Sequence, residues 1–456
     1  MTNPVADLQN GSPDAATTED ASKALLAFAE DATAGRLSFE GADVSLEAVA
    51  DTVRQSAMWD VTCGGLRLAG RSFAGASLRR ANLSGANLSG ADLSKVEGGG
   101  LNLTSTSLEG ANLAGADLIG AIFHHANGGE ANFTGALLED AKFQGSSLRF
   151  ARFTDSILDG ADLSGADLWG VRLDGATAER ANFEGALLDE SSMEGVEMPG
   201  ANLSGATLRR AKLSRAVLRD TNLRNVVLDG ADLSHADLTR ATLPNVSLAT
   251  CKLTHARFAG AWLDRTRMQA DSLGGMVGEE ASGNLDGAID SYLVLEQNFR
   301  SLGKREDESW CYRRRRRVQK QLYRRRCVEL LKRREIVPSL GMGARYMADV
   351  GAEWLCDYGD SVSRVLRAIL TTMVVFAVLY WVTGCLKTRE GYASVRAHAW
   401  VDYLLFSLDS MTTVGTSEVA LRTASQLGTL LSSLQTALGT ILLGLFGFVL
   451  GGRIRN

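Results

Sequence analysis

The segment TTVGTS, residues 412–417, places hydroxyl side chains and a glycine between two long uncharged stretches. These are the nineteen residues 368–386 and the thirty residues 423–452. Each is long enough to cross a bilayer, which needs about 20 apolar residues, although a buried core helix is the alternative. Residues 400–411 between them, WVDYLLFSLDSM, form about three helical turns and are too short to cross. Non-helical backbone is tolerated at membrane depth only where protein encloses it or it lines water, so residues 412–417 indicate a lumen.

A basic block precedes the first apolar stretch. Residues 304–334 hold 14 lysines and arginines against four acids. A nucleic-acid patch, a membrane-surface helix and a solvated helix all fit this composition. The position beside an apolar stretch favours a cytoplasmic-face helix that touches anionic headgroups between Arg313 and Arg334, and nucleic acid is not expected as a partner. With Arg453 and Arg455 after the second stretch, the positive-inside rule places both chain ends in the cytosol.

A five-residue period dominates the first half of the chain. From Leu68 to Met268, every fifth residue is Leu, Phe or Met at 38 of 41 positions. Ala is frequent two residues before these positions, and Gly two residues after them, as in ANLSGANLSGADLS. This period fits neither a helix nor a strand. It favours a chain that turns a corner every five residues and points one large and one small side chain inward from each face.

These units resemble the pentapeptide-repeat family, A(D/N)LXX. The resemblance implies a right-handed, quadrilateral parallel β-helix of four units per coil over residues 66–275. It also implies about ten coils with a rise of about 4.8 Å each, giving a rod about 50 Å long. Residues 20–65 are expected to form an N-terminal helical cap, and residues 1–19 a disordered tail.

The outward residues of the repeat have mixed charge. Residues 155–197 contain eleven acids and two arginines, whereas residues 209–224 contain a single acid among basic residues. A solvated surface is the ordinary interpretation, and a specific electrostatic partner of the acidic part is the alternative. Several bacterial pentapeptide-repeat rods mimic DNA and inhibit gyrase, which makes a DNA mimic a further hypothesis. No catalytic or metal site is predicted, because no matching acid and nucleophile set accompanies the histidines at His124, His125, His235 and His255.

The order of apolar stretch, short helix, threonine-rich loop and apolar stretch resembles the two-transmembrane pore module of the potassium-channel superfamily. The short helix would be a re-entrant pore helix. On this resemblance the selectivity filter is residues 412–417, where backbone carbonyls and a threonine hydroxyl replace the ion's water shell. Glu418 stands at the outer mouth. The inner filter residues match the family motif, and the outer two occupy its aromatic and second-glycine positions: Thr412, Thr413, Val414 and Gly415, then Thr416 and Ser417.

These two departures bear on ion choice. The aromatic normally braces the filter, and the second glycine takes backbone angles that serine adopts less readily. A cation site with weak potassium preference, or with none, is therefore expected. In the second span, Gly439 and Gly444 could form a gating hinge, and close helix packing is the alternative.

Together these features predict a tetrameric cation channel in a bacterial inner membrane, with a cytosolic β-helical rod on each subunit. The resemblance implies a homotetramer, because one two-span module cannot enclose a pore. No enzyme activity and no cofactor are expected beyond permeant monovalent cations such as K⁺ or Na⁺, and the rod is open to an unknown cytosolic partner. The rival hypothesis is an anchored scaffold or DNA mimic. The expected C-terminal regions are a basic helical linker (276–336), an amphipathic juxtamembrane segment (337–365) and a pore domain (366–456) with spans at about 366–386 and 426–451.

Overall fold

The computed structural model describes residues 68–70, 72–359, 361–388, 400–412, 419–421 and 426–454. The expected tail (1–19) and helical cap (20–65) lie outside the described residues. The chain forms two units, Met1–Arg315 and Arg316–Asn456.

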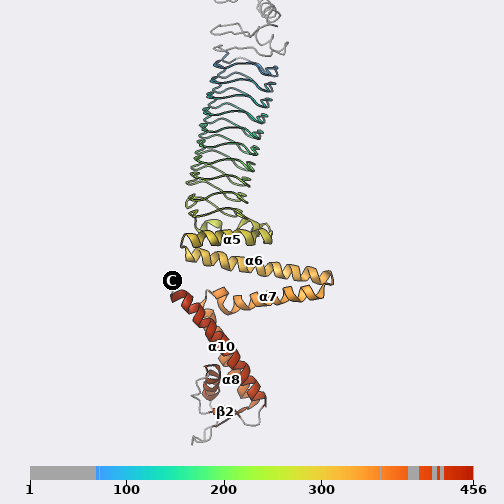
Figure 1. Ribbon diagram of the computed structural model, residues 1–456, viewed down its shortest axis with the longest axis vertical. Coiled ribbons are helices and arrows are strands. Elements are labelled where there is room, and N and C mark those ends of the chain that lie inside the picture. Colours follow the sequence, from blue (N-terminus) through green and yellow to red (C-terminus); the bar gives the residue numbers. More distant parts are fainter. Residues whose placement is uncertain are drawn as a thin grey trace, which may run out of the picture. The chain divides into compact units, whose positions relative to one another are not determined.

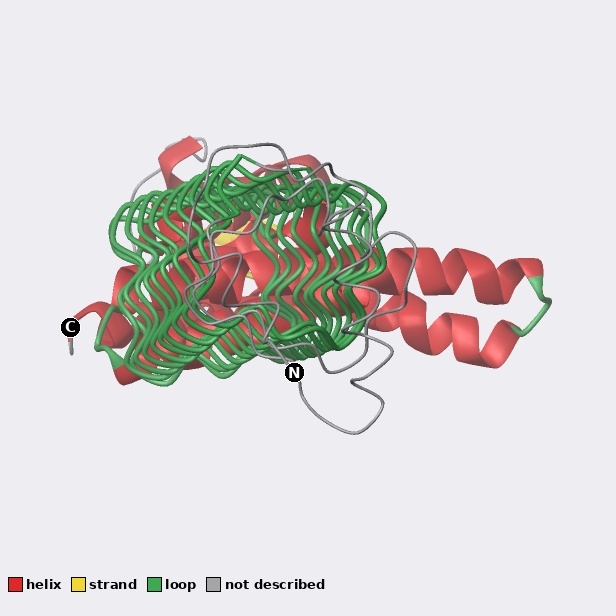
Figure 2. Ribbon diagram, turned by 90° about the horizontal axis from the view of Figure 1, so that it is seen from above, coloured by secondary structure: helices red, strands yellow, loops and turns green. Residues whose placement is uncertain are grey.

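The repeat of the first unit folds into stacked coils of 20 residues each, which is four five-residue units per coil (Figures 1 and 2). In nearly every unit, the outward residue before the large one pairs in parallel with the residue 20 positions further on, from Ser72 with Asp92 to Ser247 with Arg267. Within a side the small and the large residue are buried, as at Ala81 and Leu83. The five-residue period therefore produces the stacked, parallel β-helical coils that the resemblance implied.

Nearly all corners of the coil use a residue in the left-handed region, with Thr250 as an exception. At one corner the Ala81 N–H donates to the Leu78 carbonyl at 3.1 Å, and Arg80 between them has a φ of 55°. A positive φ at this position of a tight turn favours glycine, which explains the frequent Gly two residues after each large residue. The same register places the large side chains in continuous interior columns.

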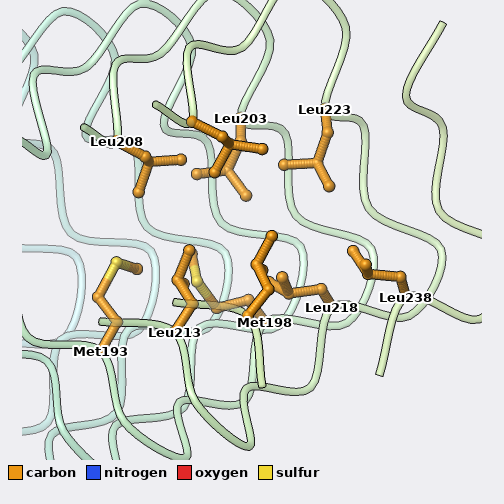
Figure 3. Close-up of a pocket in the computed structure, with 10 residues that line it drawn as sticks. Met193, Met198, Leu203, Leu208, Leu213, Leu218, Leu223 and Leu238 are labelled. Atoms are coloured by element: carbon orange, nitrogen blue, oxygen red, sulfur yellow. The ribbon is translucent and has the colours of Figure 1, made fainter. Parts of the chain in front are cut away.

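Those columns form the core of the rod. Phe123 and Phe143, one coil apart, stack with ring centroids 4.3 Å apart, and Phe133 packs edge-on against Phe123 at 5.8 Å. Where Gly98 replaces a large residue, Leu101 takes the following small position, and its Cδ2 would lie 3.3 Å from a Cβ at residue 98. A cavity of about 10 Å³ remains between leucines and methionines that point inward from neighbouring coils (Figure 3). Its lining is apolar, so the cavity should stay dry.

Short helices cover the last coil. The buried Glu279 carboxylate accepts hydrogen bonds from the N–H groups of Phe258 and Ala259 at 3.1 and 3.0 Å. Asn298 accepts from the Thr266 N–H and donates to the Thr266 carbonyl. These side chains satisfy backbone groups that the end of the stack would otherwise leave unpaired. The helices are η2 (Ala270–Leu273), α4 (Gly278–Ala281), α5 (Leu285–Ser301) and the start of α6 (Arg305–Lys332).

Where the structure describes it, the second unit is helical apart from one short strand pair. Strands β1 and β2 are antiparallel, with Leu386 opposite Leu421. Helix α8 begins and ends a few residues earlier than the expected span, because Ser361 caps its start and Gly384, with a φ of 59°, ends it. The elements are α7 (Ile336–Cys356), η3 (Asp357–Gly359), α8 (Val362–Thr383), β1 (Leu386–Thr388), α9 (Trp400–Thr412), β2 (Val419–Leu421) and α10 (Gln426–Ile454).

Candidate functional site

Helices α8 and α10 are long and apolar enough to cross a membrane. In their most apolar windows only 28% and 22% of the residues are buried within the structure. The core helix of a soluble protein would be mostly buried, so this exposure favours an apolar environment outside the chain. Large exposed side chains on both helices include Val375, Val382, Leu430 and Ile441.

Helix α9 packs along both apolar helices. Near its start, Tyr403 and Phe406 join a buried cluster with Tyr380, close to the end of α8. Near its end, Met411 packs with Ala368 and with Leu442 of α10. Ala368 lies in the first third of α8, so α9 runs antiparallel to α8.

The chain beyond α9 comes back to the end of α8. Strand β2, which begins seven residues after Thr412, pairs with β1, and β1 begins three residues after α8 ends. Leu386 of β1 also belongs to the cluster that holds the start of α9. The start of α9 and the strand that follows it, β2, therefore lie at the same end of α8.

A buried amide holds the three helices together. Gln435 of α10 accepts a hydrogen bond from the Tyr380 hydroxyl of α8 at 2.9 Å and donates to the Ser407 carbonyl of α9 at 2.9 Å. The Ser407 hydroxyl in turn donates to the Met373 carbonyl of α8 at 2.7 Å. A buried amide is costly unless its groups are paired, so this network fixes the position of α9. Sequence reasoning missed Gln435, although it is a strongly polar side chain in an otherwise Leu-rich stretch.

The two glycines proposed as a hinge differ in their surroundings. A Cβ built on Gly439 would lie 2.5 Å from the Met411 carbonyl oxygen of α9, whereas a Cβ on Gly444 would meet nothing within 4 Å. Helix α10 runs as one helix through both positions. The contact at Gly439 supports close packing there, and a hinge at either position stays a prediction.

Only one of the predicted filter residues lies in the described part of the chain. Thr412 is the last residue of α9, and its hydroxyl donates to the Leu408 carbonyl at 2.8 Å. The others lie outside the described residues: Thr413, Val414, Gly415, Thr416, Ser417 and the outer-mouth residue Glu418. Their roles stay predictions.

Much of the basic block is paired within the chain. In the first unit Arg314 binds Glu280 at 3.3 Å, and Arg315 binds the buried Glu296 at 2.9 Å. In the second unit three further cations of α6 bind carboxylates on or just after α7, the pairs being Arg316 with Asp349, Arg317 with Glu353 and Asp357, and Lys320 with Glu353. These five cations stabilise the fold, so contact with anionic headgroups rests on the remaining ones and stays a prediction.

The two main carboxylates of α7 have opposite pKa shifts. Burial raises the pKa of Asp349 and outweighs the nearby charges of Arg316 and Lys320. Burial also opposes ionisation of Glu353, but hydrogen bonds and charges from Lys320 and Arg317 outweigh it and lower the pKa of that carboxyl. Glu353 is therefore the acid that the ion pairs hold most firmly in its charged form.

On the rod, the acidic stretch carries several ion pairs with arginines of the same or neighbouring coils. Asp167 binds Arg149 at 2.6 Å, and Asp189 binds Arg209 at 3.3 Å. These pairs are exposed, so each contributes little to stability, but together they reduce the local negative charge. Among the described residues, no group of three His, Cys, Asp or Glu side chains could hold a metal ion. The rod surface thus fits the solvated, charge-mixed interpretation.

The comparisons with known proteins identify the repeat. Residues 63–96, 100–127 and 131–269 match the family model described as pentapeptide repeats, in eight copies. HetL of the cyanobacterium Nostoc sp. strain PCC 7120, a pentapeptide repeat protein involved in heterocyst differentiation regulation, is 26% identical, with 49% of this chain and 94% of HetL covered and a TM-score of 0.27.

Two other solved structures are also similar to part of the chain. QnrB1, a plasmid-mediated fluoroquinolone resistance protein, is 19% identical, with 39% of this chain and 87% of QnrB1 covered and a TM-score of 0.26. A pentapeptide repeat protein from the thylakoid lumen of Arabidopsis thaliana is 28% identical, with 27% and 68% covered and a TM-score of 0.15. No curated protein matches the chain. Residues 68–268 therefore form a pentapeptide-repeat β-helix, followed in the chain by a helical region with two candidate spans.

Proposed function

We propose that the second unit is one subunit of a membrane cation channel that carries the pentapeptide-repeat rod in the cytosol. The observation that supports this best is the path of the chain around α9. Helix α9 begins beside the end of α8, reaches the level of Ala368, and is followed by a strand that pairs beside the end of α8 again. A segment that enters and leaves the membrane on the same side, between two spans, is a re-entrant segment.

The lengths of the segments are compatible with such a loop. Thirteen helical residues extend about 20 Å, roughly two thirds of the 30 Å hydrocarbon core. Six residues connect α9 to β2, and a chain of six extended residues spans about 20 Å. Backbone at that depth needs partners other than lipid, which an ion-conducting lumen shared by several copies supplies. A homotetramer around residues 412–417 is the assembly proposed.

The sequence of the loop bears on ion choice. Carbonyl rings from Thr412 to Gly415 would coordinate partly dehydrated cations, and Glu418 would add a carboxylate from each subunit near the outer mouth. Thr416 and Ser417 lack the bulky brace and the glycine that hold outer rings in place. We therefore expect conduction of monovalent cations with weak discrimination between K⁺ and Na⁺.

An anchored scaffold is the competing function, because two apolar helices also suit a simple anchor. Purified protein in liposomes distinguishes the two. A channel gives K⁺ efflux above that of protein-free vesicles and a tetramer mass in detergent. A scaffold gives the background efflux, and a monomer mass would contradict the shared pore.

A further inference from the structure

Helix α7 leaves one apolar face without a partner in the described chain. Ile336, Leu340, Met347 and Trp354 are exposed to 65%, 68%, 63% and 65%. At about 100° per residue, these four side chains fall within about 40° of one another around the helix. Four large apolar residues aligned over the length of a helix form a contact surface, unlike apolar residues scattered singly.

The opposite face of α7 is polar and occupied. Asp349 is buried against Arg316 of α6, and Glu353 binds Arg317 and Lys320. The three charged residues of α7, which are these two acids and Arg345, all lie about 100° or more from the apolar stripe. The ion pairs therefore fix which side of α7 faces α6 and leave the stripe pointing away from it.

We propose that α7 lies in the interface of a lipid bilayer, with the stripe of Ile336, Leu340, Met347 and Trp354 buried at the level where headgroups meet acyl chains. The proposal rests on α8 crossing that bilayer, as proposed above. A helix with an apolar stripe and a charged opposite face buries the stripe about 5–10 Å into such an interface.

Three features select lipid as the occupant. Helix α8, a candidate span with exposed apolar side chains, begins six residues after α7 ends, so the apolar surface continues into the membrane. Trp354 lies at the end of α7 nearest to α8, where an amphipathic ring suits the headgroup region. No acid interrupts the stripe. The α6 cations Arg316, Arg317 and Lys320 contribute indirectly, because their ion pairs orient α7.

Collision accessibility of a nitroxide tests this placement. The spin label is introduced as an unnatural amino acid at Met347 in the full chain, which leaves the native cysteines in place. Arg345 is the matched control, because it is exposed, lies two residues away and points about 160° from Met347 around the helix. In phosphatidylcholine vesicles, the ratio of oxygen to nickel-chelate collisions should be several-fold higher at Met347 than at Arg345. Equal, water-like ratios at both positions would overturn the proposal.

A label at Val374 of α8, which is 43% exposed, separates this proposal from the proposed function. A lipid-like ratio at Val374 with a water-like ratio at Met347 contradicts only the placement of α7. A water-like ratio at both contradicts the membrane assignment. Strong spin–spin broadening at Met347 would show that a second copy covers the stripe and would also overturn the proposal.

Lipid charge supplies the final arm. Because the three α6 cations are already paired with carboxylates, the Met347 ratio should be unchanged when phosphatidylglycerol is added. A lipid-like ratio that appears only with phosphatidylglycerol would show that the basic block makes the contact in place of the stripe.

Discussion

Gly439 of α10 lies directly against the backbone of Met411, at the end of α9. A Cβ at this glycine would be 2.5 Å from the Met411 carbonyl oxygen and 2.9 Å from its Cα. The contact sets how closely the proposed pore helix approaches the second span. Position 439, which carries no side chain, therefore lies next to the start of the proposed filter.

Gly439→Ala should therefore displace α9. Overpacking of this kind costs about 1–3 kcal/mol, and the displacement should abolish or strongly reduce cation flux in liposomes. Gly444→Ala is the matched control, because a Cβ there meets nothing within 4 Å. It should keep wild-type flux and assembly. Equal flux from both variants would show that the Met411 contact does not position the pore.

The Gln435 network should behave as a unit. Tyr380→Phe removes the donor to Gln435 and leaves a buried carbonyl unpaired, which should cost about 1–3 kcal/mol and lower the melting temperature in detergent. Tyr380→Phe combined with Gln435→Leu should cost less than the sum of the two single changes. Thr440→Ala is the control, because the Thr440 hydroxyl donates to the Thr436 carbonyl of the same helix. This change should leave the stability nearly unchanged. Strict additivity of the first two changes would contradict the network.

Glu279 should make the end of the rod sensitive to pH. Burial raises the pKa of this carboxyl, although hydrogen bonds from Ser291, Ala259 and Phe258 oppose the shift. The folded state then binds more protons than the unfolded state, so stability falls as pH rises from the ordinary carboxyl range through the raised pKa. Glu279→Gln should remove this slope, measured by hydrogen exchange of the Phe258 and Ala259 amides. An unchanged slope would mean that another group titrates.

Glu279→Ala separates the acceptor from the charge. It removes an acceptor for one buried and one partly buried N–H group and should cost about 1–3 kcal/mol, with faster exchange of both amides at all pH values. Protection as strong as in the wild type would show that water or Ser291 replaces the carboxylate.

The ion pairs of Glu353 should hold α7 against α6 at neutral pH. Its lowered pKa means that the stabilisation is present above the unfolded pKa and is lost as pH falls through the folded one. Glu353→Gln should destabilise the contact by about 1–2 kcal/mol, seen as faster amide exchange in α7 at pH 7. Glu329→Gln removes an exposed pair with Arg333 and should change little. Equal effects of the two variants would contradict a specific role of Glu353 in holding α7 against α6.

The sequence predicts the rod well because its pattern is local and repeated. Ala81 and Leu83 are buried and Arg80 turns the corner, as every unit requires. The compensation of Gly98 by Leu101 was not predictable, since it depends on the packing of side chains within the interior column.

The helical unit was less predictable, since its contacts link residues far apart in the chain. The two spans and the short helix follow from apolar lengths. One partner of Gln435 is Tyr380, 55 residues away, and the partners of Arg317 lie 36 and 40 residues away. Composition does not show which residues of two helices face each other. The basic block was therefore expected to contact lipid headgroups, although part of it binds acids of its own chain. The pairing of β1 with β2 was likewise invisible in three-residue segments.

The reversal potential of purified protein in planar bilayers tests the central claim most directly. With KCl on one side and NaCl on the other, a cation pore with a weakened outer filter should give a potential near zero. In a KCl gradient the potential should lie near the equilibrium value for K⁺. A potential near the chloride value in the KCl gradient, or no conductance from protein that has assembled as a tetramer, would contradict a cation channel built around α9 and residues 412–417.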